Sequence, residues 1–217
     1  FLCSDTLSDI YAFNLHALRV RERHEDLRTL SIRVLERPDA ARPLREWVFS
    51  SLVAQLAMFE RDYLAAEQVI DRWGAEIEAS ISPASPRYSM LFNNLAVAYT
   101  EVGRIEDAER SIARISRQLH AETYPTATLG LIAIKKGDIE RGMRLYREAI
   151  ALARAPDDKA RIRQKLALEL GRHWATRNPA RARRHFRRAT LIKHGERVLS
   201  DQAVDELQSL SLLGADE

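Results

Sequence analysis

A stretch of this chain repeats itself after 34 residues, and no other feature limits its possible folds as strongly. Residues 95–109 align with residues 129–143 without a gap. The matched pairs share residue type: Gly103 with Gly137, Ile105 with Ile139, and Glu106 with Glu140. A repeat of this length holds one supersecondary unit, which buries its apolar face only against its neighbours. The chain is therefore expected to fold as a stack of similar units.

The local sequence favours helices throughout. The segments between the prolines are rich in Ala, Leu, Arg and Glu, which are good helix formers. Hairpin dipeptides and sustained period-2 alternation are absent from the sequence. Helices are expected over residues 5–22, 25–36, 43–59, 62–80, 86–101, 105–119, 123–136, 139–154, 158–176, 179–194 and 200–212. Short loops between them make consecutive helices antiparallel pairs.

Small residues recur where the helices of such a stack come closest. Ala96 and Gly130 fall in the first helices, where we expect the two helices of a pair to touch. Ala108 and Gly142 fall in the second helices, where we expect contact with the next pair. Larger side chains at these positions would push the helices apart.

Gly103 and Gly137 directly follow the apolar stretches of the first helices. Glycine adopts the left-handed conformation that commonly ends a helix, so we expect both to act as C-cap glycines.

The period of 34, with small residues at its eighth and twentieth positions, resembles the tetratricopeptide repeat family. The resemblance is carried by residues 89–122 and 123–156, and Ala66 and Ala182 extend it to the flanking segments. It implies an all-α fold, a right-handed superhelix of helix hairpins in a single domain over residues 1–217. The implied helix pairs lie near 5–36, 47–80, 89–122, 123–156 and 163–194, with a capping helix at 200–212. Members of this family usually bind partner proteins.

Composition excludes several classes of protein. Hydrophobic residues make up 46% and charged residues 30% of the 217 residues, which is unlike a disordered chain. The single cysteine, Cys3, cannot form an internal disulfide, so we expect a reducing, cytoplasmic location. The apolar stretches are far shorter than the ~20 residues that span a bilayer. Because the chain starts at Phe1 without a signal-peptide pattern, we expect it to be part of a longer protein.

Catalytic motifs are absent from the sequence. Glycine-rich phosphate loops do not occur, and a single cysteine excludes a zinc site built on thiolates. The six histidines are not spaced for a two-ligand helical metal site: His16, His24, His120, His173, His185 and His194. We therefore expect a protein that is not an enzyme, with no catalytic residues, no metal and no cofactor.

The resemblance implies a concave inner face lined by the first helices. The residues that would bind a partner there are Asn93, Asn94, Val97, Tyr124, Leu131, Ile134 and Trp174. Met58, Phe59 and Met90 would lie on the same face. Asn93 should point into the groove, whereas Asn94 should lean toward the neighbouring helix. Large apolar side chains on a water-facing surface can mark a binding site. The alternative, that neighbouring helices bury them, is equally compatible with the sequence.

Charge is distributed unevenly along the chain. Residues 157–199 hold 13 Lys or Arg and 4 Asp or Glu, a net charge of +9, and the remainder carries −6. At 100° per residue, Arg181, Arg184 and Arg188 share one helix face. This basic patch fits a solvated surface, an acidic protein partner or a nucleic acid. Nucleic acid is the least favoured, because Phe186 falls at a packing position and cannot stack on bases.

Two functions follow from these observations. The first is a non-catalytic scaffold or regulatory domain that binds a protein or peptide on its concave face. The alternative is a regulatory domain of a larger signalling or transcription protein, which uses its basic last repeat to bind nucleic acid or an acidic partner. Membrane association is not expected, and the sequence leaves homo-oligomerisation open.

Overall fold

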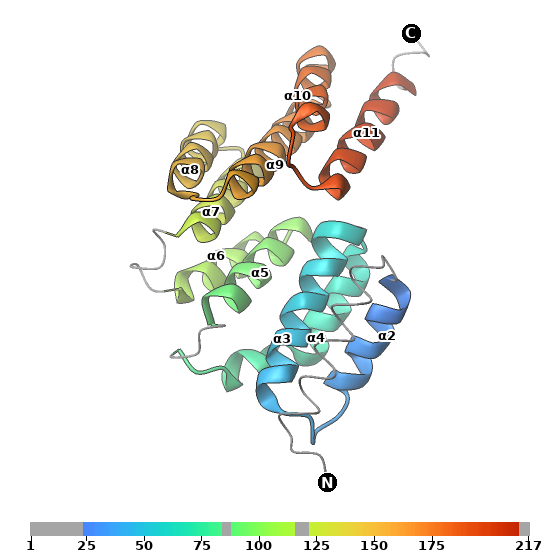
Figure 1. The fold of residues 1–217 in the computed structure, drawn as a ribbon, viewed down its shortest axis with the longest axis vertical. Coiled ribbons are helices and arrows are strands. Elements are labelled where there is room, and N and C mark those ends of the chain that lie inside the picture. Colours follow the sequence, from blue (N-terminus) through green and yellow to red (C-terminus); the bar gives the residue numbers. More distant parts are fainter. Residues whose placement is uncertain (1–23, 84–87, 116–121, 213–217) are drawn as a thin grey trace. The chain divides into compact units, whose positions relative to one another are not determined.

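The computed structural model describes residues 24–83, 88–115 and 122–212. The regular secondary structure of these residues consists of helices alone, which confirms the all-α prediction (Figure 1). The helix expected over residues 5–22 lies outside the described residues. None of the described helices has the length and apolar character needed to cross a membrane. The chain divides into two compact units, one up to Gly103 and one from Arg104.

The first unit is built around its second helix. Its elements are α2 (His24–Leu35), α3 (Arg42–Ala54), a π-helical turn η1 (Gln55–Glu60), α4 (Tyr63–Ser80) and α5 (Tyr88–Glu101). Helix α3 packs against α2, α4 and α5. Its side chains Phe49 and Val53 are fully buried, so α3 forms the core of this unit. A proline in the first turn starts α3, where its missing N–H costs nothing.

The second unit contains a short first helix, two helix hairpins and a final helix. Its elements are α6 (Ile105–Arg114), α7 (Thr123–Lys135), α8 (Ile139–Leu152), α9 (Pro156–Trp174), α10 (Pro179–Leu191) and α11 (Arg197–Leu212). Helix α7 packs against α8 and α9 against α10, while α11 covers α10 and α9. Most ends of these helices lie within three residues of the predicted ones, because prolines, glycines and N-cap residues mark them in the sequence. The helix predicted over residues 105–119 is the exception, since α6 ends at Arg114 and Ile115 is extended.

The helices α4, α6, α8 and α10 bury the same positions. The first of these positions holds a small residue in each helix: Ala66 in α4, Ala108 in α6, Gly142 in α8 and Ala182 in α10. The residues four positions later are Ile70, Ile112, Tyr146 and Phe186, and those seven positions later are Trp73, Ile115, Ala149 and Ala189. All of these residues are buried. A burial pattern that recurs in alternate helices is consistent with a helical repeat.

The turns before these helices also recur. Gly103 and Gly137 have φ of 85° and 88°, which confirms that left-handed glycines end the first helices. Arg61 takes the same conformation, with φ of 58°, before α4. Three of the four helices begin with a side chain that accepts a backbone N–H three residues later, namely Asp62, Asp138 and Asn178. These caps satisfy amide groups that a helix start leaves without a partner.

Two glycines allow α7 and α8 to touch. A Cβ atom on Gly130 would lie 2.8 Å from Tyr146 Cδ2 and 3.1 Å from the Gly142 carbonyl oxygen. A Cβ atom on Gly142 would lie 2.5 Å from Ile134 Cγ1 and 2.9 Å from the Gly130 carbonyl oxygen. The expectation for Gly130 is therefore confirmed. The expectation that Gly142 meets the next pair was wrong, because its nearest neighbours belong to α7 of the same pair.

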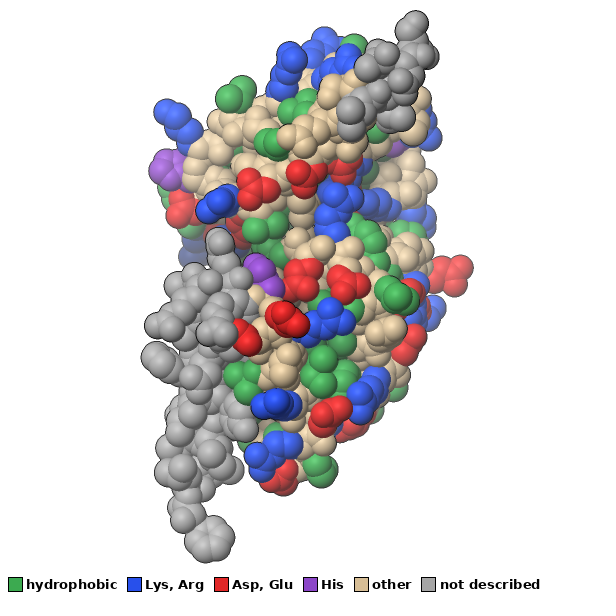
Figure 2. All heavy atoms as spheres, turned by 90° about the vertical axis from the view of Figure 1, so that its right-hand side faces the viewer, with side chains coloured by type: hydrophobic (Ala, Val, Ile, Leu, Met, Phe, Trp, Pro, Cys, Tyr) green, Lys and Arg blue, Asp and Glu red, His purple; other side chains and the backbone are tan. Residues whose placement is uncertain are grey.

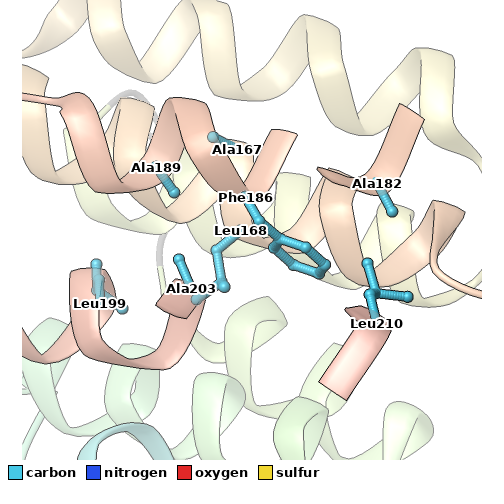
Figure 3. Close-up of a cluster of buried hydrophobic side chains, with 8 residues drawn as sticks. All are labelled: Ala167, Leu168, Ala182, Phe186, Ala189, Leu199, Ala203 and Leu210. Carbon is cyan, nitrogen blue, oxygen red and sulfur yellow. The ribbon is translucent and has the colours of Figure 1, made fainter. Parts of the chain in front are cut away.

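The last three helices share a hydrophobic core (Figure 3). Its buried members are Ala167 and Leu168 from α9, Ala182, Phe186 and Ala189 from α10, and Leu199, Ala203 and Leu210 from α11. The Phe186 ring occupies the space that a side chain at Gly171 would need. On the opposite side of α11, Asp201, Val204 and Asp205 are exposed. A final helix with an outer face of this kind fits the end of a helical stack.

A buried amide fixes the connection between α10 and α11. The Gln164 side chain of α9 is fully buried. Its Nε2 donates to Ser200 Oγ at 2.8 Å and to the Ala189 carbonyl at 3.3 Å. Its Oε1 accepts from the Glu196 backbone N–H at 2.7 Å. Because its groups are all paired, Gln164 links the three helices without leaving a buried polar group unsatisfied.

Candidate partner-binding surfaces

The predicted inner-face residues of the first unit lie on α5. Asn94 Nδ2 donates to Ser50 Oγ of α3 at 2.9 Å, so Asn94 leans toward the neighbouring helix as expected. Asn93 is half-buried and Val97 is only 6% exposed. Asn94 is half-buried as well, so exposure does not distinguish the two amides.

The three methionine and phenylalanine positions expected on the same face differ in exposure. Met58 and Phe59 are half-buried in the π-helical turn, and Met90 at the start of α5 is 41% exposed. The structure does not show these three side chains as a continuous apolar lining.

In the second unit, the apolar residues of the predicted site are interior. Leu131 is 2% exposed and Ile134 is 4% exposed. Ile134 packs against α8 at Gly142. Both side chains, like Val97 in the first unit, stabilise the interior and offer no surface to a partner. The alternative reading of these apolar positions, burial by other parts of the fold, describes them better.

Tyr124 is the accessible aromatic residue of the predicted site. Its side chain is at the start of α7, and the residue is 39% exposed. Its hydroxyl donates to Asp158 Oδ1 at 2.6 Å and accepts from Arg161 Nη1 at 3.2 Å. Arg161 also pairs with Glu196 at 2.8 Å. These contacts fix the ring between α7 and α9.

The same surroundings keep the Tyr124 hydroxyl protonated. Partial burial and the hydrogen bond to the Asp158 carboxylate raise the pKa of Tyr124 to about 12. The hydroxyl therefore remains a donor at neutral pH. The arrangement provides a rigid ring with one exposed part and a fixed polar end, which suits recognition of another molecule.

A buried ion cluster joins the other end of α7 to α9. Glu169 is 1% exposed, and three cations surround its carboxylate. Lys135 lies 3.1 Å away, Lys165 3.0 Å and Arg172 2.8 Å. Burial alone would raise the pKa of Glu169, but these charges outweigh it and hold the pKa far below its ordinary value. Glu169 is therefore ionised at neutral pH.

Arg172 extends this cluster to α11. Its guanidinium donates to Glu206 at 3.0 Å and to Gln202 Oε1 at 3.1 Å. The cluster was not predicted from the sequence, although Lys165 and Arg172 stand one helical turn before and after Glu169. That spacing was the available signal. The contribution of Lys135, from another helix, becomes evident only when α7 and α9 are packed together.

Trp174 and the first arginine of the basic patch form a pair. The Arg181 guanidinium carbon lies 3.9 Å from the centroid of the Trp174 ring. Trp174 is half-buried and packs against the core of the last three helices. A guanidinium over an indole ring is a favourable cation–π arrangement. The two residues, predicted for separate surfaces, are thus brought together at the start of α10.

Helix α10 presents the rest of the basic patch, Arg184 and Arg188, to solvent together with Arg187, which was not predicted to belong to it. Arg184, Arg187 and Arg188 are exposed, and none has an ion-pair partner among the residues that the structure describes. Figure 2 shows Lys and Arg side chains gathered at the top of that view, where α10 lies. Arg183 differs, because its Nη2 donates to the Leu210 carbonyl at 3.0 Å and so holds the end of α11.

The pKa of His185 depends on these arginines and can be measured. Burial, followed by the charges of Arg181, Arg188 and Arg184, lowers the pKa of His185 below its ordinary 6.5. We expect the pKa of His185 to rise when Arg184 and Arg188 are changed together to Gln. In the wild-type protein the lowered pKa means that, below about pH 6.5, the unfolded chain binds more protons at His185 than the folded chain does. The free energy of unfolding of the wild-type protein therefore decreases as the pH falls below 6.5. NMR titration of the imidazole measures this, and a wild-type pKa at or above the ordinary value would contradict it.

Comparisons with known proteins and a search for metal ligands add no assignment. A scan against family models finds no match, and searches of curated proteins and of solved structures find no significantly similar protein. In residues 24–83, 88–115 and 122–212, the acidic, histidine and cysteine side chains form no group suited to a metal ion.

Proposed function

We propose that this chain is a tetratricopeptide-like domain, a right-handed superhelix that acts as a non-catalytic scaffold or regulatory module. Its partner is a protein or peptide, bound on the face formed by the first helices of the pairs. The proposal is supported by the recurrent burial and turns of α4, α6, α8 and α10. Stacked helix pairs of this kind provide extended surfaces for binding.

Tyr124 is the single observation that carries the proposed binding face. The residue is 39% exposed on a first helix, and Asp158 and Arg161 hold its hydroxyl. A tyrosine fixed in this way loses little conformational entropy when a partner packs on it. Tyrosine is also enriched among the few residues that dominate interface affinity.

Site-specific crosslinking of the full-length protein tests this proposal. The photoreactive analogue p-azidophenylalanine replaces Tyr124, which keeps an aromatic ring at this position without the hydroxyl, or replaces Arg144, which is exposed on the second helix α8. We expect a protein adduct from position 124 in cells that produce the protein, and none from position 144. Equal labelling from both positions, or none from 124, would refute binding at this face.

A second candidate function is a regulatory domain that binds an anionic partner through its last helix pair. The unpaired arginines of α10 favour it.

A further inference from the structure

The outward face of α10 combines unpaired charge with one prominent apolar side chain. Arg184, Arg187 and Arg188 are exposed. Leu191, the last residue of the helix, is 78% exposed and is the most exposed of the large apolar residues that the structure describes. Leu191 follows Arg188 by three residues and Arg187 by four, so it lies beside them on the helix surface.

The rest of the helix shows that the described residues do not neutralise this charge. Ala182, Phe186 and Ala189 point into the core with α9 and α11 (Figure 3). The sequence of α10 contains five arginines and no acidic residue, so it cannot neutralise itself. Arg181 covers Trp174 and Arg183 caps α11, whereas the other three guanidinium groups have no ion-pair partner among the residues that the structure describes.

We propose that this face docks an acidic segment of a partner protein, whose carboxylates pair with the three arginines and whose apolar side chain covers Leu191. Arginine pairs with carboxylates through two parallel hydrogen bonds, and it is enriched at protein interfaces where lysine is depleted. Leu191 distinguishes a protein from a nucleic acid, since a phosphate backbone gains nothing from an exposed leucine. A single leucine is also too little apolar surface for stable anchoring in a bilayer. The proposal rests on the second candidate function above, in which the last helix pair binds an anionic partner.

Helix α8 offers a matched control for the test. Arg144 and Arg147 are exposed, without ion-pair partners in the described part of the chain, and occupy the positions equivalent to Arg184 and Arg187. Two acidic residues, Glu140 and Glu148, are also exposed on α8, so its surface is mixed in charge. Reversing either pair to Glu changes the net charge by the same amount.

The experiment measures binding of defined probes to the intact protein by fluorescence anisotropy. One probe is a labelled helical peptide with glutamates along one face and leucines beside them, and a second has its leucines replaced by glutamine. A 20-base-pair DNA duplex and vesicles containing phosphatidylserine are the other probes. The leucine peptide is expected to bind most tightly, and more weakly as salt is added.

The variants separate charge from apolar contact. Arg184→Glu with Arg187→Glu should weaken binding of the leucine peptide at least about tenfold, since each factor of ten is only ~1.4 kcal/mol. Arg144→Glu with Arg147→Glu should change it less than about threefold on the same scale. Leu191→Gln should remove the preference for the leucine peptide over its glutamine counterpart. Tighter binding of the duplex or the vesicles, equal effects of the two reversals, or no binding of either peptide would overturn the proposal.

Discussion

Gly130→Leu is expected to lower the free energy of unfolding by about 3 kcal/mol or more, at the upper end of overpacking effects. Even the first atom of the new side chain would lie 2.8 Å from Tyr146 Cδ2, and a carbonyl of α8 stands 3.1 Å away. The ring is fully buried and the carbonyl belongs to the backbone, so neither can move aside without separating α7 from α8. Chemical denaturation followed by circular dichroism measures the loss.

Gly74 in α4 provides the control with the opposite sign. A Cβ atom there would meet Ile70 Cγ2 at 3.4 Å and Phe49 Cζ at 3.6 Å, which are ordinary contact distances. Gly74→Ala should therefore stabilise the protein by up to about 1 kcal/mol through helix propensity. Stability unchanged by Gly130→Leu, or a loss no larger than that of an exposed substitution, would mean that α7 and α8 are not packed through this glycine.

Glu169→Gln is expected to have the second large effect, a loss of about 3 kcal/mol, typical of breaking a buried ion pair by removing one partner. Without the carboxylate, the charges of Lys135, Lys165 and Arg172 would remain close together at a largely buried site. An exposed pair gives the comparison. Glu109 and Lys136 are 2.7 Å apart with side chains 47% and 49% exposed, so Glu109→Gln should cost at most about 1 kcal/mol.

The Glu169 carboxylate should also make the stability of the folded protein depend on pH in the acidic range. Because the folded state lowers the pKa of Glu169 below its ordinary 4.5, its contribution to stability is complete above that pH. It is lost as the pH falls further, toward the folded-state pKa. Glu169→Gln should therefore flatten this part of the stability curve. An equally steep curve in the variant would show that Glu169 is not held ionised in the fold.

Much of the helical architecture was predictable from the sequence, because local signals determine it. Left-handed glycines at Gly103 and Gly137 and prolines at helix starts mark element ends wherever they occur. The apolar periodicity then indicates the buried positions of the second helices. These signals act within a few residues and do not depend on how the helices are arranged.

The predicted inner face was less successful for a physical reason. Helix α7 contains a continuous apolar run, Leu129–Ile134. Its apolar periodicity therefore does not distinguish residues that face a concave, solvent-accessible groove from residues buried against other helices. Leu131 and Ile134 turned out to be buried. The setting of Tyr124 depends on Asp158 and Arg161, which only the packing of α9 beside α7 brings near.

The contact between Gly130 and Tyr146 is the point on which the account depends most. It sets α7 against α8 as the two helices of one pair, and the proposed binding face of the first helices follows from that pairing. A double-mutant cycle of Gly130→Ala and Tyr146→Ala, measured as free energies of unfolding, tests it most directly. If the ring causes the clash, Gly130→Ala should cost much less once Tyr146 is Ala, with a coupling energy of at least about 1 kcal/mol. Additive effects, within about 0.5 kcal/mol, would contradict the assignment.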